Sequence, residues 1–173
     1  MKKTAIILFA VLFGTMQAKA YELEVDGIYY NFKEGTTDEV VVTCFIDYWY
    51  DDFDGVGNYK GHIVIPETII HEDKIYRVTG IDYFGFKEGE IESVIIPKSI
   101  KNIGLMAFRN LRGTLKRIEV QWQTLFELKE LEIENNELWT DYEDIVLVVP
   151  KNTKTFYQEH DIWKKFIHIE ESQ

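Results

Sequence analysis

The chain has 173 residues, 46% of them hydrophobic, and a formal net charge of −11 from 19 basic and 30 acidic side chains. Nucleic acid is an unfavourable partner for so acidic a protein, because such binding relies on Lys and Arg to neutralise phosphates, and anionic membrane surfaces are disfavoured for the same reason. Cys44 is the sole cysteine, so an intramolecular disulfide is excluded. Length and composition predict one packed domain.

Residues 1–20 have the pattern of a cleaved secretory signal peptide. Lys2 and Lys3 precede an apolar run from Ala5 to about Phe13, and Ala18-Lys19-Ala20 fits the small-residue spacing of a cleavage site. The run is shorter than the roughly 20 residues that span a bilayer. We expect export of residues 21–173 to the periplasm, the cell surface or the medium. Removing three of the 19 basic residues leaves 16 against 30 acidic ones, a formal charge of −14.

Residues 21–61 are predicted to form an N-terminal cap and a loop. Tyr21 to Phe32 and Glu39 to Tyr48 are rich in β-branched and aromatic residues and flank a turn-like Lys-Glu-Gly-Thr-Thr-Asp, which indicates a β-hairpin. Repeat stacks need such caps to cover their apolar ends. In the second strand, Cys44 is interpreted as a small buried apolar residue, with a nucleophile or an intermolecular disulfide as alternatives.

The loop at residues 47–61 contains an acidic and an aromatic cluster. Its four Asp residues lack EF-hand spacing, so a solvated loop is favoured over a Ca²⁺ site. Trp49 and Tyr50, between Tyr48 and Phe53, are candidate binding residues, because Trp and Tyr are enriched at interaction hot spots. The alternative is that these rings cover the end of the repeat stack.

Residues 62–150 contain an internal repeat. Residues 81–86 (Ile-Asp-Tyr-Phe-Gly-Phe) match residues 103–108 (Ile-Gly-Leu-Met-Ala-Phe) at an offset of 22, and residues 91–96 match residues 115–120 at an offset of 24. A period of roughly 20–29 residues with apolar ladders is typical of leucine-rich repeats. Further strand copies end at Pro66 and Pro150, as the central copy ends at Pro97. The prolines are predicted to stop the strands.

Alternation within each repeat strand predicts one core-facing and one outward-facing set. The core set is Ile63, Ile65, Val94, Ile96, Ile118 and Val120, and the outward set is His62, Val64, Ser93, Ile95, Arg117 and Glu119. The opposite wall of each coil is predicted to contain Ile81, Phe84, Phe86, Ile103, Met106 and Phe108.

The last part of the chain is predicted to be less regular. Residues 121–145 break the repeat with an acidic, Leu-containing stretch that indicates a partly helical turn. Residues 151–173 are predicted to form a C-terminal cap: a helix after Asn152 or Thr153, with apolar positions from Phe156 to Trp163 at helical spacing. Residues 166–169 are predicted to form a closing strand.

Residues 91–108 resemble the repeat of BspA-like leucine-rich repeat proteins, which reads approximately Leu-x-x-Ile-x-Ile-Pro-x-Ser-Ile-x-x-Ile-Gly-x-x-Ala-Phe. The opening Val25-Asp-Gly-Ile-Tyr-Tyr30, residues 61–67 and residues 149–166 are similar to small secreted members of this group. A frequent Cys after the Ala-Phe signature is replaced by Gly89 and Leu111. The resemblance implies a mainly β, right-handed leucine-rich-repeat-like solenoid with some α structure, a hairpin cap and a helix cap, and no catalytic residues.

The remaining residues favour binding over catalysis. The four His residues lack the i, i+4 spacing of helical metal sites, and no nucleophile with an adjacent base can be argued. We predict no enzyme activity, cofactor or bound metal. The predicted function is contact with an extracellular protein or glycan through the exposed strand face, and the alternative is a structural, self-associating protein. The candidate binding residues on this face are Val64, Ile95, Glu119 and Val148, of which the three apolar ones mark a partner surface.

Overall fold

The computed structural model describes residues 21–44, 59–111, 113–138 and 140–173. The predicted signal peptide, the acidic loop up to residue 58, and the candidates Trp49 and Tyr50 lie outside these ranges. The described strands and helices, in chain order, are β1 (Leu23–Val25), β2 (Ile28–Phe32), β3 (Glu39–Thr43), β4 (Lys60–Val64), β5 (Thr68–His71), β6 (Lys74–Ile81), β7 (Glu90–Ile96), β8 (Asn102–Ile103), β9 (Arg117–Val120), α1 (Leu125–Lys129), β10 (Glu132–Ile133), η1 (Glu134–Asn136), β11 (Val146–Val149), α2 (Lys154–Glu159), η2 (Trp163–Lys165) and β12 (His168–Glu171).

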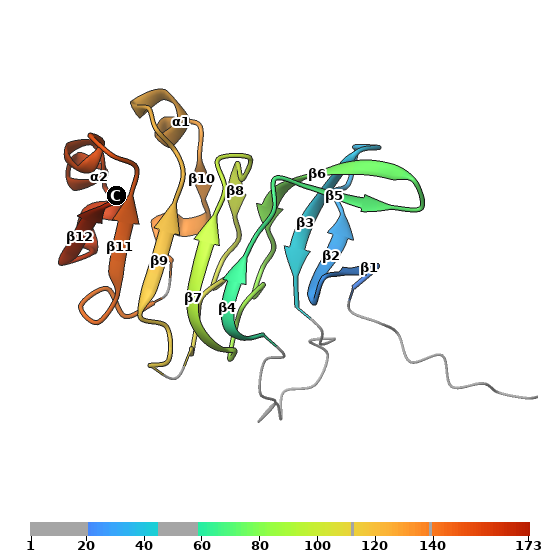
Figure 1. Ribbon diagram of the computed structural model, residues 1–173, viewed down its shortest axis with the longest axis horizontal. Coiled ribbons are helices and arrows are strands. Elements are labelled where there is room, and N and C mark those ends of the chain that lie inside the picture. The colour runs from blue at the N-terminus through green and yellow to red at the C-terminus, as the bar shows by residue number, and fades with distance from the viewer. Residues whose placement is uncertain (1–20, 45–58, 112, 139) are drawn as a thin grey trace, which may run out of the picture.

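The strands form two facing sheets, and the chain alternates between them (Figure 1). Sheet A has the order β1-β2-β3-β6-β8-β10, with β5 paired to β6, and sheet B has the order β12-β11-β9-β7-β4. All neighbouring strands of sheet B are parallel, as are β6, β8 and β10 of sheet A. Alternation between two parallel sheets is the path of a solenoid, so the predicted mainly β fold with some α structure is confirmed.

Sheet B contains the repeat strands in the predicted register. Ile63 aligns with Val94, Val94 with Ile118, and Ile96 with Val120. These side chains and Ile65 are buried, so the predicted core set is confirmed. β7 and β11 end immediately before Pro97 and Pro150, and β4 ends two residues before Pro66, in agreement with their role as strand stops.

The opposite wall repeats at the offset of 22 found in the sequence. Phe84, Phe86 and Glu88 each donate a backbone hydrogen bond to the residue 21 positions later, on the next coil. Phe84 and Met106, which occupy equivalent positions, both have φ near +60° (59° and 58°). Phe86 and Phe108 are also equivalent, and their rings stack at 5.5 Å between centroids. Equivalent positions of the repeat therefore share their backbone conformation as well as their apolar character.

Most of the predicted residues of this wall are buried, but Met106 is only half-buried. The equivalent Phe84 has the same positive φ and is buried, so the backbone conformation is shared and the difference in burial lies in the side chains.

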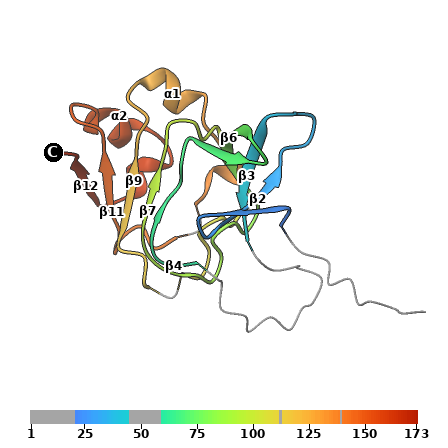
Figure 2. The ribbon, with the colours of Figure 1, turned by 45° about the vertical axis from the view of Figure 1, so that its right-hand side comes forward.

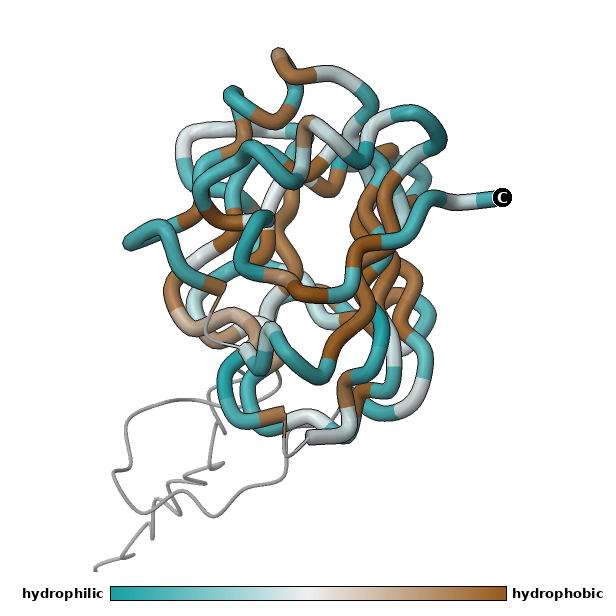
Figure 3. Tube along the Cα trace, turned by 90° about the vertical axis from the view of Figure 1, so that its left-hand side faces the viewer, coloured by the Kyte–Doolittle hydropathy of each residue, from teal (hydrophilic) through white to brown (hydrophobic). Residues whose placement is uncertain are grey.

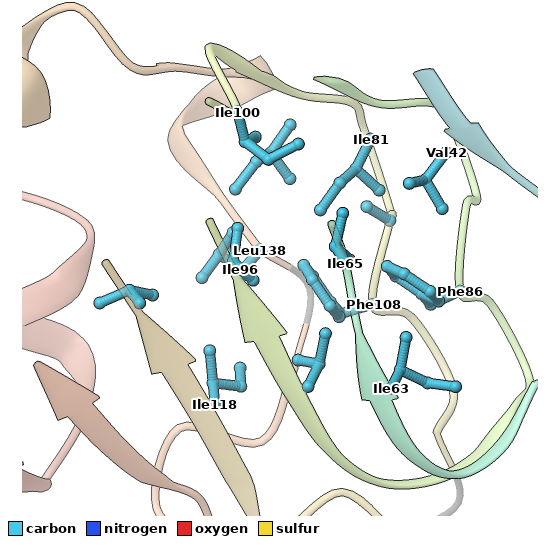
Figure 4. Packing of buried hydrophobic residues seen from close by; sticks show 14 of the residues in the cluster. Val42, Ile63, Ile65, Ile81, Phe86, Ile96, Ile100, Phe108, Ile118 and Leu138 are labelled. Carbon is cyan, nitrogen blue, oxygen red and sulfur yellow. The ribbon is translucent and has the colours of Figure 1, made fainter. Parts of the chain in front are cut away.

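The core lies between the two sheets and runs the length of the stack. Figure 4 shows Ile63, Ile65, Ile96 and Ile118 of the sheet B wall facing Ile81, Phe86, Ile100 and Phe108. Figure 3, viewed from the C-terminal end, shows the coils superimposed around a common centre with hydrophobic segments along the walls. Burial of this apolar surface is the main favourable contribution to folding.

The N-terminal cap differs in detail from its prediction. β2 and β3 form the expected antiparallel hairpin, but Asp26 and Gly27, both at positive φ, divide the first segment into a second hairpin of β1 and β2. β3 ends at Thr43 rather than continuing to residue 48. Cys44, directly after it, is buried as predicted. The cap extends sheet A beyond the repeats.

The C-terminal cap also differs in detail. α1 occupies the irregular stretch, as predicted, and begins with a capping box between Thr124 and Glu127. α2 ends at Glu159, and Trp163 lies in the separate short helix η2, because the backbone leaves the helical conformation at His160. The closing strand β12 starts at His168, two residues later than predicted, where it pairs in parallel with Val146 of β11.

Candidate binding surface

The four candidate residues of the strand face form one continuous row across sheet B. Val64 aligns with Ile95, Ile95 with Glu119, and Glu119 with Val148. Glu170 of β12 completes the row. Neighbouring strands are spaced by about 4.8 Å, so the row is a regular ladder on the side of sheet B that faces away from the core. The four residues predicted from the sequence thus lie side by side although they belong to four separate strands.

Exposure along this row is uneven. Val64 is 59% exposed, and Ile95 and Glu119 are half-buried, but Val148 is only 1% exposed. The prediction that Val148 contributes an exposed apolar contact is therefore wrong. Its short side chain lies between the longer side chains of Glu119 and Glu170 on the flanking strands. The apolar part of the row that a partner can reach is Val64 and Ile95, on β4 and β7.

A second row on the same face is polar. Ser93 and Arg117 align between His62 on β4 and Val146 on β11. His62 Nδ1 lies 2.8 Å from Ser93 Oγ, and Arg117 Nη2 lies 3.2 Å from Glu119 Oε2. The Arg117–Glu119 pair joins the two rows. These side chains are exposed or half-buried, so their interactions contribute little to stability.

The structure exposes further apolar side chains that the sequence pattern did not single out. Ile70 and Ile75 face each other across the β5–β6 hairpin and are 68% and 61% exposed. The hairpin turns at Glu72 and Asp73, both at positive φ, a pair without the Asn-Gly or Asp-Gly signal of such turns. Phe126 on α1 is 72% exposed, on the opposite side of its helix from the buried Leu128.

The described residues provide no cluster of three or more His, Cys, Asp or Glu side chains arranged to hold a metal ion. Within the same ranges, no helix has both the length and the apolar character required to cross a membrane. The acidic loop that was considered for Ca²⁺ falls largely outside the described residues.

Comparison with known proteins found similar solved structures only. Neither a protein-family model nor a curated protein matches the chain. A leucine-rich repeat protein from Bacteroides capillosus ATCC 29799 has 13% identity and a TM-score of 0.49, over 87% of this chain and 98% of that chain.

Two longer proteins are similar to most of this chain. A leucine-rich cell surface protein from Faecalibacterium prausnitzii A2-165 has 19% identity and a TM-score of 0.41, with 86% and 31% coverage of this chain and that chain. A leucine-rich repeat protein from Bacteroides ovatus ATCC 8483 has 19% identity and a TM-score of 0.43, with 76% and 38% coverage. This chain thus spans about a third of each. The assignment of the fold rests on the strand order and register described above.

Proposed function

We propose that this protein is a non-catalytic binding module that is exported from the cell and contacts an extracellular protein or glycan through the outer face of sheet B. The proposal rests on the alignment of Val64, Ile95 and Glu119 in one row of this face. The adjacent row contains His62, Ser93 and Arg117. Three neighbouring parallel strands, β4, β7 and β9, hold these side chains in fixed register. Because the backbone is already ordered, binding does not require the entropic cost of ordering a flexible loop.

The chemistry of the face is divided along the sheet. Val64 and Ile95 make the β4–β7 end apolar, whereas Arg117 and Glu119 make the centre charged. An apolar contact bordered by polar groups is common at protein interaction sites, in which a few residues supply most of the affinity. The central charges determine specificity and association rate more than affinity.

The test is binding of the purified protein to immobilised extracellular matrix proteins, mucins and glycans, measured by biolayer interferometry at physiological salt. We expect saturable binding to at least one of them, weakened by the double substitution V64S/I95S. Phe126→Ser is the matched control, because it also removes a large exposed apolar side chain but lies on α1, away from the face. Equal binding by all three proteins would show that the outer face is not the site.

A second candidate function is self-association, and the open edge of β12 favours it. β12 pairs with β11 only among the described strands, and unpaired strand edges are templates for pairing with another chain. Sedimentation velocity at increasing protein concentration separates the two functions. A particle that grows with concentration, together with no binding to any immobilised ligand, would favour the structural function.

A further inference from the structure

β4 is hydrogen-bonded on one side only. The Ile65 N–H donates to the Ile95 C=O of β7 at 3.1 Å. Because the N–H and C=O of one strand residue point to the same side, and successive residues alternate, the backbone groups of His62 and Val64 point away from β7. No hydrogen bond satisfies these groups within the described part of the chain. The open edge of β4 therefore presents two N–H donors and two C=O acceptors.

The open edge lies beside an overhang of the opposite sheet. Sheet A continues beyond β6 through β3, β2 and β1, whereas sheet B ends at β4. Figure 2 shows β1 and β2 on the open side of β4. A groove of about 710 Å³ lies where sheet A extends past β4. Its volume is within the range of about 300–1,000 Å³ that is typical of ligand sites. It is lined mainly by apolar residues from the cap, β4 and β5, including Val25, Ile28, Ile63, Val64, Ile69 and Ile70.

The groove also contains a buried polar group without a partner. Tyr30 lines it, and the Tyr30 hydroxyl has no hydrogen-bond partner in the described structure, although its side chain is fully buried. Burial, and then the negative charge of Asp26, raise the pKa of Tyr30, so the hydroxyl stays protonated and can donate. Buried polar groups are almost always paired. The wall of the groove therefore contains an unpaired, protonated hydroxyl near the acidic rim residue Asp26.

We propose that the β4 edge binds an extended peptide from another protein by β-strand addition, with apolar side chains at alternate positions of the peptide facing the groove. The His62 and Val64 backbone groups would pair with the main chain of the peptide, which is the source of affinity in this mode of recognition. A basic residue near Asp26 would complement its charge. This site goes beyond the proposed function, because it uses the edge of sheet B rather than its outer face.

The boundaries of the edge favour a short peptide over stacking of a second copy. A β-bulge between Gly61 and His62 interrupts the register at one end, and Pro66, which lacks an N–H, lies just beyond the other end. Bulges and prolines at strand edges oppose open-ended pairing of sheets. The accessible edge is thus about as long as a short peptide strand, whereas sheet stacking requires a longer, uninterrupted one.

Fluorescence anisotropy of the intact protein with a labelled peptide, Lys-Thr-Val-Thr-Val-Thr-Val-Lys, tests the proposal. We expect saturable binding, and its loss when the Val amide nitrogens are N-methylated, since that change removes N–H donors and leaves the side chains. A peptide of the same composition with its three Val residues adjacent is the second control. If all three peptides bind equally, or if none binds, the proposal is wrong.

The peptide affinities of protein variants test whether the peptide binds at the β4 edge. Val64→Pro removes the edge N–H and should bind the peptide roughly three- to tenfold more weakly than Val64→Thr, which retains the N–H and a β-branched side chain; this ratio is the effect of one hydrogen bond. Ile70→Glu, at an exposed position of the groove, is a second variant should Val64→Pro lower the melting temperature. Ile95→Ser alters the outer face of sheet B and should leave peptide binding unchanged. The proposal for the β4 edge and the proposal for the outer face can therefore be refuted separately.

Two results would contradict the assignment of the edge. Equal peptide affinity of the Val64→Pro and Val64→Thr proteins would show that the edge N–H is not used. If sedimentation instead shows that Val64→Pro converts an oligomer to a monomer, the occupant of the edge is a second copy, and the peptide proposal is overturned.

Discussion

The hydroxyl of Tyr59 connects the N-terminal cap to the first repeat strand, and its removal should destabilise the protein. It donates to the Thr43 C=O at 2.6 Å and accepts from the Tyr29 N–H at 2.9 Å. Thr43 and Tyr29 are register partners across β3 and β2, so the hydroxyl bridges the two strands at the end of their ladder. The Tyr59 ring also packs edge-on against Phe86 at 4.9 Å. The substitution Tyr59→Phe retains the ring and removes the bridge.

The size of the effect follows from the two backbone groups that lose their partner. A buried donor or acceptor left unsatisfied costs about 1–3 kcal/mol, so we expect Tyr59→Phe to lower the free energy of unfolding by about 2 kcal/mol or more. For a chain of this size, about 1 kcal/mol corresponds to roughly 2–4 °C in melting temperature. Urea denaturation followed by tryptophan fluorescence, with a thermal melt by circular dichroism, measures both quantities.

Tyr30→Phe is the matched control, on the adjacent residue of the same strand as Tyr29. The Tyr30 hydroxyl is buried and has no partner within the described residues, so its removal should leave the free energy of unfolding unchanged or raise it. A loss below about 0.5 kcal/mol for Tyr59→Phe would refute the reasoning, because it would mean that the Tyr29 N–H and Thr43 C=O pair without the bridge.

Three further predictions concern other parts of the fold. Val148→Ser should lower the free energy of unfolding by about 1–3 kcal/mol in urea denaturation, because it places a hydroxyl at a buried site, whereas Val64→Ser should change it by less than about 0.5 kcal/mol; equal effects would contradict the burial of Val148. Burial lowers the pKa of His160 below its ordinary value of 6.5. Just below pH 6.5, His160 is therefore protonated more fully in the unfolded chain than in the folded one. Stability should fall as the pH drops through this window, less so in His160→Gln, and parallel pH profiles would exclude His160 as the cause. Gly104→Ala should lower the melting temperature, because the added Cβ would lie 2.6 Å from the Tyr83 backbone N of the preceding coil; an unchanged melt would show that the coils can separate.

The sequence alone determined the repeat and its inward-facing residues. Strand alternation has a period of two, so a single strand copy such as residues 91–96 is sufficient to divide its side chains between core and surface. The offset of 22 predicted which residues stack, and Phe86 and Phe108 do so. These features are local properties of a strand, repeated at a regular distance, and they require no knowledge of the neighbouring coils.

The tertiary structure decided what depends on neighbours from distant parts of the chain. Val148 has the same outward register as Val64 but is buried, because β9 and β12 flank it, whereas β4 has an open side. The division of the first cap segment into β1 and β2 is different, because Asp26-Gly27 is an Asp-Gly pair of the kind that forms two-residue hairpin turns, and the prediction of one continuous strand overlooked it. The groove beside β4 exists only because sheet A extends further than sheet B at that end. Periodicity determines which way a side chain points, whereas its exposure depends on the flanking strands and on the size of their side chains, since Ile95 also lies between two strands and is only half-buried.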